Sequence, residues 1–569
     1  MAVTARTPAA LLRLAPTGAG ALRAGAVLGL LLLVGIPLLL LIFSSVRGPQ
    51  GVLPFQSAAY FTADNFAQAL THRDLLPTLR DTGFYVGGAV VLSLLIAFPL
   101  AWLAERADLP FPNALFVLVL VPFLLPQGTL VGAWVGYLLP RTGELNVWLR
   151  GVLDLGIDRG PLDPYNLPMM VVAQGLVLTP VVFLVLAATL RNLDGALEEA
   201  SRAAGASALT TARRVTLPLV FPGVFTAAVL AVWLTLDSTT VPFTFGGQAE
   251  ASLLNFRIWA ALNPPDQSFS GFGLASAFAL LAMLLLGLLF GLYAFTTRRV
   301  ERFATVTGRS ARSHRAELGY WSLPAALFVL AYLALMWGLP GYRLVRGSLV
   351  AGLSGYWAQL TNPRFLDALF NSAVMSIGSA TIGTIVVVLV AWVVVRSRAG
   401  PWRTGLDLLA TASLVIPAAV AGVAFLLAFL MARELSLYGS LAGVTYALAY
   451  RVAIPYRIAN ASMRQIGAEM EEASATSGAP PFTTLRRVTF PLLAPAVSIS
   501  WIFFFVFAVR ESTIVRYLGF VEPTIGAGSR FVRGGPPGSA AAGTVLTFLF
   551  ILGTILLVRW LLFRWGRLR

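Results

Sequence analysis

The sequence lacks cysteine and lysine altogether, and it holds only two histidines, His72 and His314. Without cysteine the chain forms no disulfide, thiolate metal site or cysteine nucleophile. Without lysine it forms neither a Schiff base nor a P-loop, whose lysine reaches the nucleotide phosphates. Two isolated histidines are too few for a strong histidine metal site. We therefore expect no catalytic residue, no metal site and no cofactor bound by this chain.

Charged residues are also scarce, at 12% of the 569 residues, whereas 57% are hydrophobic and the mean hydropathy is +0.80. Soluble domains hold about 25% charged residues. All 41 basic residues are arginine, and the net charge is +16. Such a surplus can indicate nucleic-acid binding, but arginines beside cytoplasmic ends of membrane spans give the same total, and no soluble basic domain is evident. The composition predicts an integral membrane protein that binds no nucleic acid.

Charge-poor apolar runs recur twelve times along the chain, each near the length of about 20 residues that crosses a bilayer core. We expect an all-α integral membrane protein with about 12 transmembrane helices. The tenth run is the weakest, because Arg451 and Arg457 interrupt it. The first run is longer than a signal-peptide core and lacks a small-x-small cleavage site after it, so we expect a retained anchor. The predicted spans are 25–43, 83–104, 111–140, 165–190, 215–236, 267–296, 318–342, 368–395, 408–432, 435–461, 490–509 and 541–558.

Arginine is clustered in alternate loops, which sets the expected orientation. Both tails, 1–24 and 564–569, are predicted to be cytoplasmic. The basic segment 297–318, poor in large apolar residues, is predicted to be a cytoplasmic linker between two halves, 25–296 and 319–563. Each half has six predicted spans, and an even number returns the chain to the side on which it started. The two halves are therefore expected to insert with the same orientation, as parallel repeats.

One polar segment occurs twice. EEASRAAGASALTTARRVTLPL begins at Glu198, and EEASATSGAPPFTTLRRVTFPL begins at Glu471. From Glu198 to Val224, 16 of 27 positions are identical at a shift of 273. Its periodicity predicts a short helix, a turn of positive φ at Gly205 or Gly478, and a second helix. Each copy is predicted on the cytoplasmic side. The copies are too long and too alike for plain connections, so we expect two equivalent partners, or one dimer.

Both segments resemble the E-A-A-x-x-x-G motif of ABC importer permeases. The motif reads Glu199-Ala200-Ser201 with Gly205, and Glu472-Ala473-Ser474 with Gly478, with serine where the family has alanine. The resemblance implies two fused permease halves, most similar to iron(III)-type and thiamine-type importers. The residues assigned to the two ATPase-coupling loops are Glu198, Glu199, Ala200, Gly205, Arg213, Arg214, Pro218, Glu471, Glu472, Ala473, Gly478, Arg486, Arg487 and Pro491.

The same resemblance implies the partners. The loops would dock on a dimer of ATP-binding subunits, which holds ATP and Mg and hydrolyses the ATP, so that this chain is no enzyme. A solute-binding protein would deliver the solute at the outer face of the bacterial inner membrane. Iron(III) is the expected solute, and thiamine, a polyamine or a phosphonate is the alternative. A secondary transporter of twelve spans is the alternative of another class, but it needs its own ion site and no duplicated docking loop.

Acidic residues inside predicted spans are costly and therefore informative. Asp237 lies about 19 residues beyond Pro218 and Glu511 about 20 beyond Pro491, in the triplets DST and EST, which correspond with a one-residue slip in the repeat register. They are candidates for the translocation path, where acids favour a cation. The alternative is a structural pair between arginine and Glu511 that locks spans ten and eleven. The candidate path residues are Asp237, Ser238, Thr239, Glu511, Ser512 and Thr513.

Overall fold

The computed structural model has a helical fold with one two-stranded antiparallel ribbon, β1 (Arg47–Gly48) and β2 (Tyr60–Phe61). Most of the predicted linker and the outer parts of both predicted tails lie outside the described residues. Those are 16–109, 111–125, 127–154, 156–193, 195–245, 251–263, 271–300, 318–350, 352–397, 400–527 and 539–567.

Within the described ranges, eight helices are long and apolar enough to cross a membrane, and the number rises to ten if each of two bent pairs counts as one span. The all-α membrane fold is confirmed, but twelve continuous spans are not present. The continuous spans are Gly20–Ser45, Leu75–Arg106, Leu167–Arg191, Arg213–Asp237, Phe272–Leu292, Gly319–Val350, Pro363–Arg396 and Ser539–Leu557.

Proline breaks the predicted span 111–140. The run 111–140 forms α5 (Pro112–Leu120), a 3-10 turn at Val121–Leu124 and α6 (Gln127–Leu138). Pro122 has no N–H for the helical ladder, and Leu125, which precedes Pro126, is extended at φ −72° and ψ 143°. The hydropathy of this run is correct for a span, but its prolines end the helix halfway.

Three predicted spans of the second half are also interrupted. The run 408–432 is a pair of helices bent by 116°, because Pro417 follows an extended Ile416. The run 435–461 divides into α21 (Leu441–Leu448) and α22 (Ala453–Gln465) around Arg451. The run 490–509 begins in a pair bent by 83°.

The helices pack as two compact units, each with its own core. Unit 1 is Met1–Ser44, Leu366–Ile525 and Leu549–Arg569, and unit 2 is Ser45–Phe365 and Gly526–Phe548. The first span of the chain thus packs among helices of the second predicted half, and the span after the linker packs among helices of the first. The sequence boundaries of the two repeats stay a prediction.

In unit 2, α4 (Leu75–Arg106) packs along α8 (Leu167–Arg191), and α11 (Leu217–Asp237) packs against both. Leu100, Phe183 and Val220 are fully buried where they meet. The other helices of this unit are α3 (Asp64–Thr71), α7 (Glu144–Leu153), α9 (Gly195–Ala203), α10 (Ala208–Thr211), α12 (Thr240–Phe245), α13 (Leu254–Leu262), α14 (Phe272–Val300), α15 (Ser322–Leu333), α16 (Leu339–Val350), α17 (Gly352–Leu360) and the start of α28 (Ser539–Arg567).

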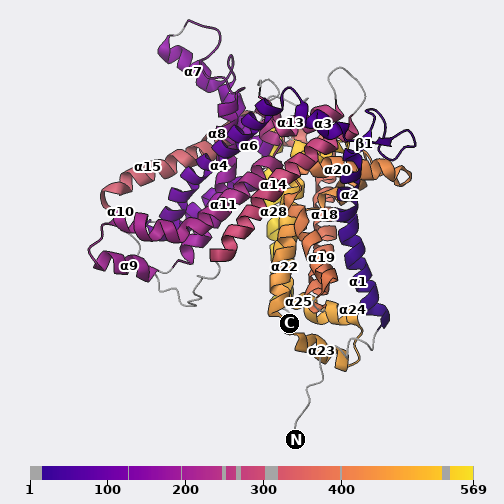
Figure 1. The fold of residues 1–569 in the computed structure, drawn as a ribbon. Coiled ribbons are helices and arrows are strands. Elements are labelled where there is room, and N and C mark those ends of the chain that lie inside the picture. Colours follow the sequence, from indigo (N-terminus) through magenta and orange to yellow (C-terminus); the bar gives the residue numbers. More distant parts are fainter. Residues whose placement is uncertain are drawn as a thin grey trace. The chain divides into compact units, whose positions relative to one another are not determined.

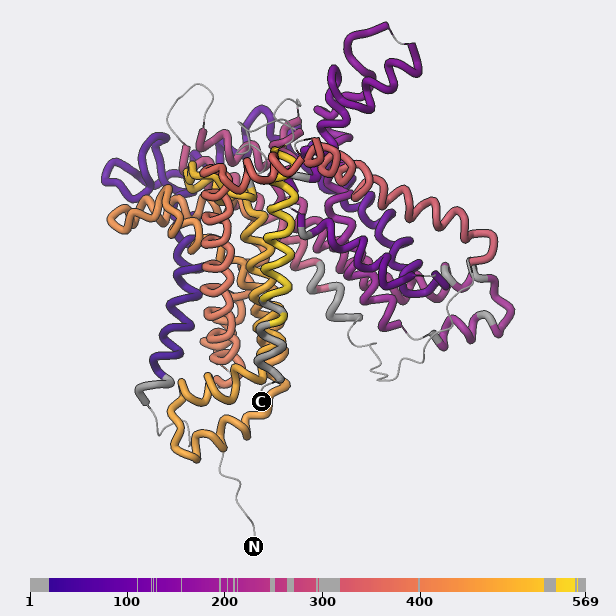
Figure 2. The backbone as a smooth tube through the Cα atoms, turned by 180° about the vertical axis from the view of Figure 1, so that it is seen from behind, coloured from indigo at the N-terminus to yellow at the C-terminus, as the bar shows by residue number. Residues whose placement is uncertain are grey.

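In unit 1, α1 (Pro16–Leu30) and α2 (Ile36–Ser45) run beside α18 (Pro363–Arg396) and α19 (Pro401–Ala412), as both backbone views show (Figures 1 and 2). The core holds large aromatic side chains, among them Tyr450, Phe425 and Phe504. The other helices are α20 (Ala418–Met431), α21, α22, α23 (Ala468–Thr476), α24 (Pro481–Thr484), α25 (Phe490–Leu492), α26 (Ala494–Arg510), α27 (Thr513–Tyr517) and the remainder of α28.

Four π-turns each directly precede a residue followed by proline. A proline in a helix clashes with the carbonyl four residues back, and the wider π-turn makes room for it. The N–H groups of Ile36, Leu339 and Phe490 accordingly reach back five residues, to the carbonyls of Leu31, Ala334 and Leu485. The π-turns are Leu31–Gly35, Ala212–Thr216, Ala334–Gly338 and Leu485–Thr489.

Two tryptophans dock α15 and α16 onto α5 and α6 by pairing with carbonyls that proline leaves open. Trp134 Nε1 donates to the Leu335 carbonyl at 2.9 Å. In a π-turn this carbonyl would accept the N–H of residue 340, but Pro340 has none. Trp337 Nε1 donates to the Leu118 carbonyl at 2.7 Å. In an α-helix this carbonyl would accept the N–H of residue 122, but Pro122 has none. Because an unpaired carbonyl in a bilayer is costly, these bonds fix the contact within unit 2.

Candidate coupling loops and candidate translocation path

The two repeated segments have the same backbone. In unit 2, α9 ends in a turn where Gly205 has φ +85°, and α10 follows. In unit 1, α23 ends in a turn where Gly478 has φ +82°, and α24 follows. The residue after each glycine closes the turn by an N–H bond to the motif serine carbonyl, at 3.1 Å and 3.2 Å. The predicted helix–glycine–helix is confirmed in both copies. In its own unit, each loop lies at one end of the long helices (Figure 1).

Two hydrogen bonds hold each loop together. One joins the hydroxyls of the motif serine and a threonine of the second helix. The other runs from a threonine of the π-turn to the first glutamate of the segment. They are Ser201–Thr211 at 2.9 Å and Thr216–Glu198 at 2.8 Å in unit 2, and Ser474–Thr484 at 2.9 Å and Thr489–Glu471 at 2.9 Å in unit 1. The serine that replaces the alanine of the family motif therefore has a partner in both loops.

An arginine at the end of a long helix anchors each loop. Arg396, at the end of α18, pairs with Glu471 at 3.1 Å and donates to the Ile466 carbonyl at 3.0 Å. Arg106, at the end of α4, lies 3.7 Å from Glu198 and donates to the carbonyls of the α8 end at 2.7–2.8 Å. The sequence analysis did not single out either arginine as an anchor. The available signal was that each ends the second span of its half.

The second glutamate of each motif faces away from these contacts. Glu199 is exposed, Glu472 is partly exposed, and neither takes part in an ion pair among the described residues. Ala200, Ala473 and the four arginines of the π-turns are exposed, as is Pro218, whereas Pro491 is partly buried. Large apolar side chains are exposed on the same loops: Leu197 at 50%, Met470 at 54% and Phe482 at 60%. Each loop thus presents an apolar and acidic surface held from behind by an arginine.

Exchanging Arg396 for methionine should loosen the unit 1 loop while the helices stay folded. The exchange removes a partly buried ion pair and leaves the Ile466 carbonyl without that donor, a loss of about 1–3 kcal/mol. We expect amide hydrogen exchange to accelerate about tenfold or more over residues 468–489 and to stay unchanged over α20. Arg433→Met is the matched control, since Arg433 is 83% exposed. Equal protection of the loop in both variants would refute the anchoring role.

The candidate path triplets begin where the fifth span of each half ends. α11 ends at Asp237 and α26 at Arg510, and the following residues, Ser238 and Glu511, are both extended. These ends keep the shift of 273 found in the loops. In the structural register Asp237 therefore matches Arg510, and Glu511 matches Ser238, so the two acids do not occupy equivalent positions.

Glu511 is bound on both carboxylate oxygens. Its Oε2 pairs with Arg451 Nη2 at 2.6 Å, and both side chains are buried. Its Oε1 accepts the N–H of Thr513 at 2.7 Å and that of Ile514 at 3.3 Å, at the start of α27. The residue thus joins the end of α26, the start of α27 and the turn between α21 and α22. The structural pair that the sequence left open is formed with Arg451.

Asp237, Ser238 and Thr239 are buried in unit 2, and the Ser238 hydroxyl donates to Gln127 Oε1 at 3.1 Å. In unit 1, Thr513 is buried as well, and Ser512 is partly buried. In the parts of the chain that the structure describes, no cluster of three or more His, Asp or Glu side chains is arranged to hold a metal ion. A role of these six residues in passage stays a prediction.

The chain is similar to known membrane transport proteins along most of its length. It is 24% identical over 515 residues to a protein assigned as ferric transport system permease FbpB 1 of Haemophilus influenzae, covering 84% of this chain and 77% of that one. It is 24% identical to the ferric transport system permease FbpB of Actinobacillus pleuropneumoniae, over 78% of this chain and 65% of that one. It is 28% identical to a protein assigned as ABC transporter permease y4fN of Sinorhizobium fredii, over 57% of this chain and 59% of that one.

The sequence pattern of the binding-protein-dependent transport system inner membrane components matches residues 89–302 and 383–567, one copy for each predicted half. Each matched range includes one coupling loop, its anchoring arginine and one end of a fifth span. The matches together cover more than half of the chain. The chain therefore belongs to the family of binding-protein-dependent transport system inner membrane components, the membrane-spanning permeases of ABC importers.

Proposed function

We propose that the chain is a two-half permease of an ATP-driven importer of iron(III). The observation that carries the proposal is the pair of identically built loops, each held by an arginine. A transporter driven by two ATPase subunits needs two equivalent contact points in the membrane component. One chain with two such loops supplies both, and both termini are proposed to face the cytoplasm with them.

The loop surfaces support docking by an ATPase. An apolar contact, with Leu197 on one loop and with Met470 and Phe482 on the other, favours insertion of a short helix into a groove. Glu199 and Glu472 lie on the same short helices as Leu197 and Met470, and neither has an ion pair of its own among the described residues, which leaves them open to a basic partner group. The anchors Arg106 and Arg396 connect each loop to a long helix of the membrane part, so a displaced loop pulls on that helix.

The solute is proposed from two observations. Two relatives that align with 84% and 78% of this chain are ferric transport permeases. Asp237, a buried acid at the end of span five, favours a cation over an oxyanion in a passage that it would line with Ser238 and Thr239. Glu511 contributes less to this argument, because Arg451 neutralises it. We propose delivery of the iron by a separate binding protein outside the inner membrane.

We expect the purified chain alone to release no phosphate from ATP, and iron uptake to appear only when an ATPase and a binding protein are present. The measurement is uptake of radioactive iron(III) into proteoliposomes loaded with ATP and reconstituted with this chain, a candidate ATPase subunit and a candidate solute-binding protein. Phosphate release by the chain alone, above a mock preparation, would contradict the assignment as a permease subunit.

The secondary-transporter alternative is tested in the same vesicles. Partners with an inactive ATPase should abolish uptake, and a proton or sodium gradient should not restore it. Uptake that follows the ion gradient and ignores ATP would establish the other class. ATP-driven uptake of molybdate, sulfate or spermidine in place of iron would leave the importer assignment standing and overturn the solute.

A further inference from the structure

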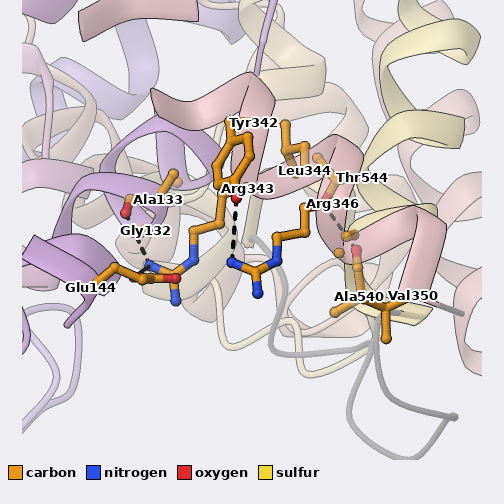
Figure 3. A pocket seen from close by; sticks show the side chains of 13 residues that line it. Gly132, Ala133, Glu144, Tyr342, Arg343, Leu344, Arg346, Val350, Ala540 and Thr544 are labelled. Atoms are coloured by element: carbon orange, nitrogen blue, oxygen red, sulfur yellow. Dashed lines mark hydrogen bonds and ion pairs between the residues drawn. The ribbon is translucent and has the colours of Figure 1, made fainter. Parts of the chain in front are cut away.

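A pocket of about 650 Å³ in unit 2 lies apart from the coupling loops and the span-five ends. Its walls come from α6, the start of α7, α16 and the first turns of α28. Figure 3 shows two arginines of α16, Arg343 and Arg346, at the pocket, with Glu144 beside Arg343. The α6 and α28 walls present small residues, including Gly132, Ala541 and Thr544, and α16 adds the larger Leu344 and Val350. The pocket therefore combines two walls of small residues with two guanidinium groups.

The charges in the pocket do not balance. Arg343 Nη1 lies 3.5 Å from Glu144 Oε2 and 3.3 Å from the Ala133 carbonyl. Arg346 has a single hydrogen-bond partner in the described part of the chain, the Tyr342 hydroxyl at 3.4 Å, and no ion pair there. Two guanidinium groups thus face one carboxylate, and Arg346 is exposed with most of its donors open. This arrangement has room and charge for one further anionic group.

The depth of the pocket in the membrane limits which class of anion can reach it. Trp321, 72% exposed, opens the span Gly319–Val350, as interfacial tryptophans do. Arg343 follows 22 residues later, about 33 Å along a helix, which is close to the thickness of the hydrocarbon core. The arginines therefore lie at the level of the lipid headgroups. From that level toward the bilayer centre, Leu335, Leu339 and Tyr342 are 37–58% exposed and form an apolar strip on the same span.

We propose that this pocket binds the phosphate of an anionic phospholipid, with the acyl chains along the apolar strip of Leu335, Leu339 and Tyr342. Arg346 and Arg343 would donate to the phosphate oxygens, and Thr544 of α28 lines the opposite wall. Arg343 reaches the pocket across Gly136, where an added Cβ would overlap its guanidinium group. Glycine at this position is thus part of the site. The proposal is independent of the transported solute and of the ATPase.

The test is native mass spectrometry of the delipidated full chain titrated with dioleoylphosphatidylglycerol, dioleoylphosphatidylcholine or inorganic phosphate. We expect the tightest phosphatidylglycerol site to weaken about tenfold in Arg346→Gln and in Gly136→Ala, from the loss of charge-assisted hydrogen bonds. Gly136→Ala changes no charge, so a loss of binding in this variant reports on the pocket and not on general electrostatic attraction between an anionic lipid and a basic protein. Thr544→Trp fills the pocket from the opposite wall. It is the substitute test if Arg346→Gln does not accumulate in the membrane.

The controls are Arg364→Gln, an exposed arginine at the start of α18, and Gly87→Ala, a helical glycine with open space beside it. Both should bind phosphatidylglycerol as the natural chain does. Equal binding of phosphatidylcholine would overturn the proposal, as would unchanged binding in Arg346→Gln, Gly136→Ala and Thr544→Trp together. Competition by inorganic phosphate at equal concentration would overturn the assignment to a lipid.

Discussion

We expect the exchange of Glu511 for glutamine to deplete the protein from the membrane and not merely to slow transport. Glutamine keeps an oxygen for the N–H groups of Thr513 and Ile514, so the start of α27 stays capped. It removes the charge that pairs with Arg451 at 2.6 Å, where both side chains are buried. A buried arginine left without its partner costs about 3–5 kcal/mol, a large part of the stability of a typical protein. The measurement is the amount of protein in isolated membranes and its unfolding temperature in detergent.

Three companion variants make this result specific. Arg451→Met combined with Glu511→Gln should recover much of the lost protein, because replacing both charges removes the unpaired ion. Glu434→Gln, in a surface pair with an 88% exposed glutamate, should change nothing. Asp237→Asn should leave the protein level normal and reduce uptake, as a path residue would. Normal protein and normal uptake in both acid variants would remove these residues from the mechanism.

We expect valine at Gly205 and Gly478 together to separate the permease from its ATPase and to abolish uptake. The two glycines have φ +85° and +82°, a region that a β-branched residue avoids at a cost of about 1–2 kcal/mol per turn. A Cβ at either position meets no atom within 4 Å, so the penalty comes from the backbone alone. The turn then opens, the two short helices lose their relative placement, and docking weakens about tenfold per loop.

Asparagine is the matched replacement, because it tolerates this backbone region. Gly205→Asn with Gly478→Asn should therefore retain most of the co-purified ATPase and most of the uptake. Glu199→Arg with Glu472→Arg tests the docking face separately, since it changes charge at the surface and leaves the turn intact. Membrane levels should be normal in all these variants. Full ATPase co-purification and full uptake in the valine and arginine variants would contradict the docking assignment.

The coupling loops follow from the sequence alone because their determinants are local. A glycine at a fixed place in a short polar segment sets a positive φ wherever the segment lies. Leu197 and Ala200 fall on one helix face by spacing alone. The membrane location follows from composition in the same way, because about 20 apolar residues cross a bilayer in any fold. The family and the general function were therefore available before any coordinate was known.

Tertiary structure alone decided which groups meet. Glu511 follows Arg510 directly in sequence and lies 60 residues after Arg451, but packing pairs its carboxylate with Arg451. The breaks at 121–125 and 449–452 separate helices whose hydropathy predicts single spans, and tryptophans from elsewhere in the chain satisfy carbonyls that proline leaves open. The anchoring arginines and the pocket on α16 are likewise invisible in composition. The physical reason is that lipid is as apolar as a helix surface, so hydrophobicity places helices in the membrane without choosing their neighbours. That choice rests on shape and on buried polar pairs between residues distant in sequence, such as Arg451 and Glu511.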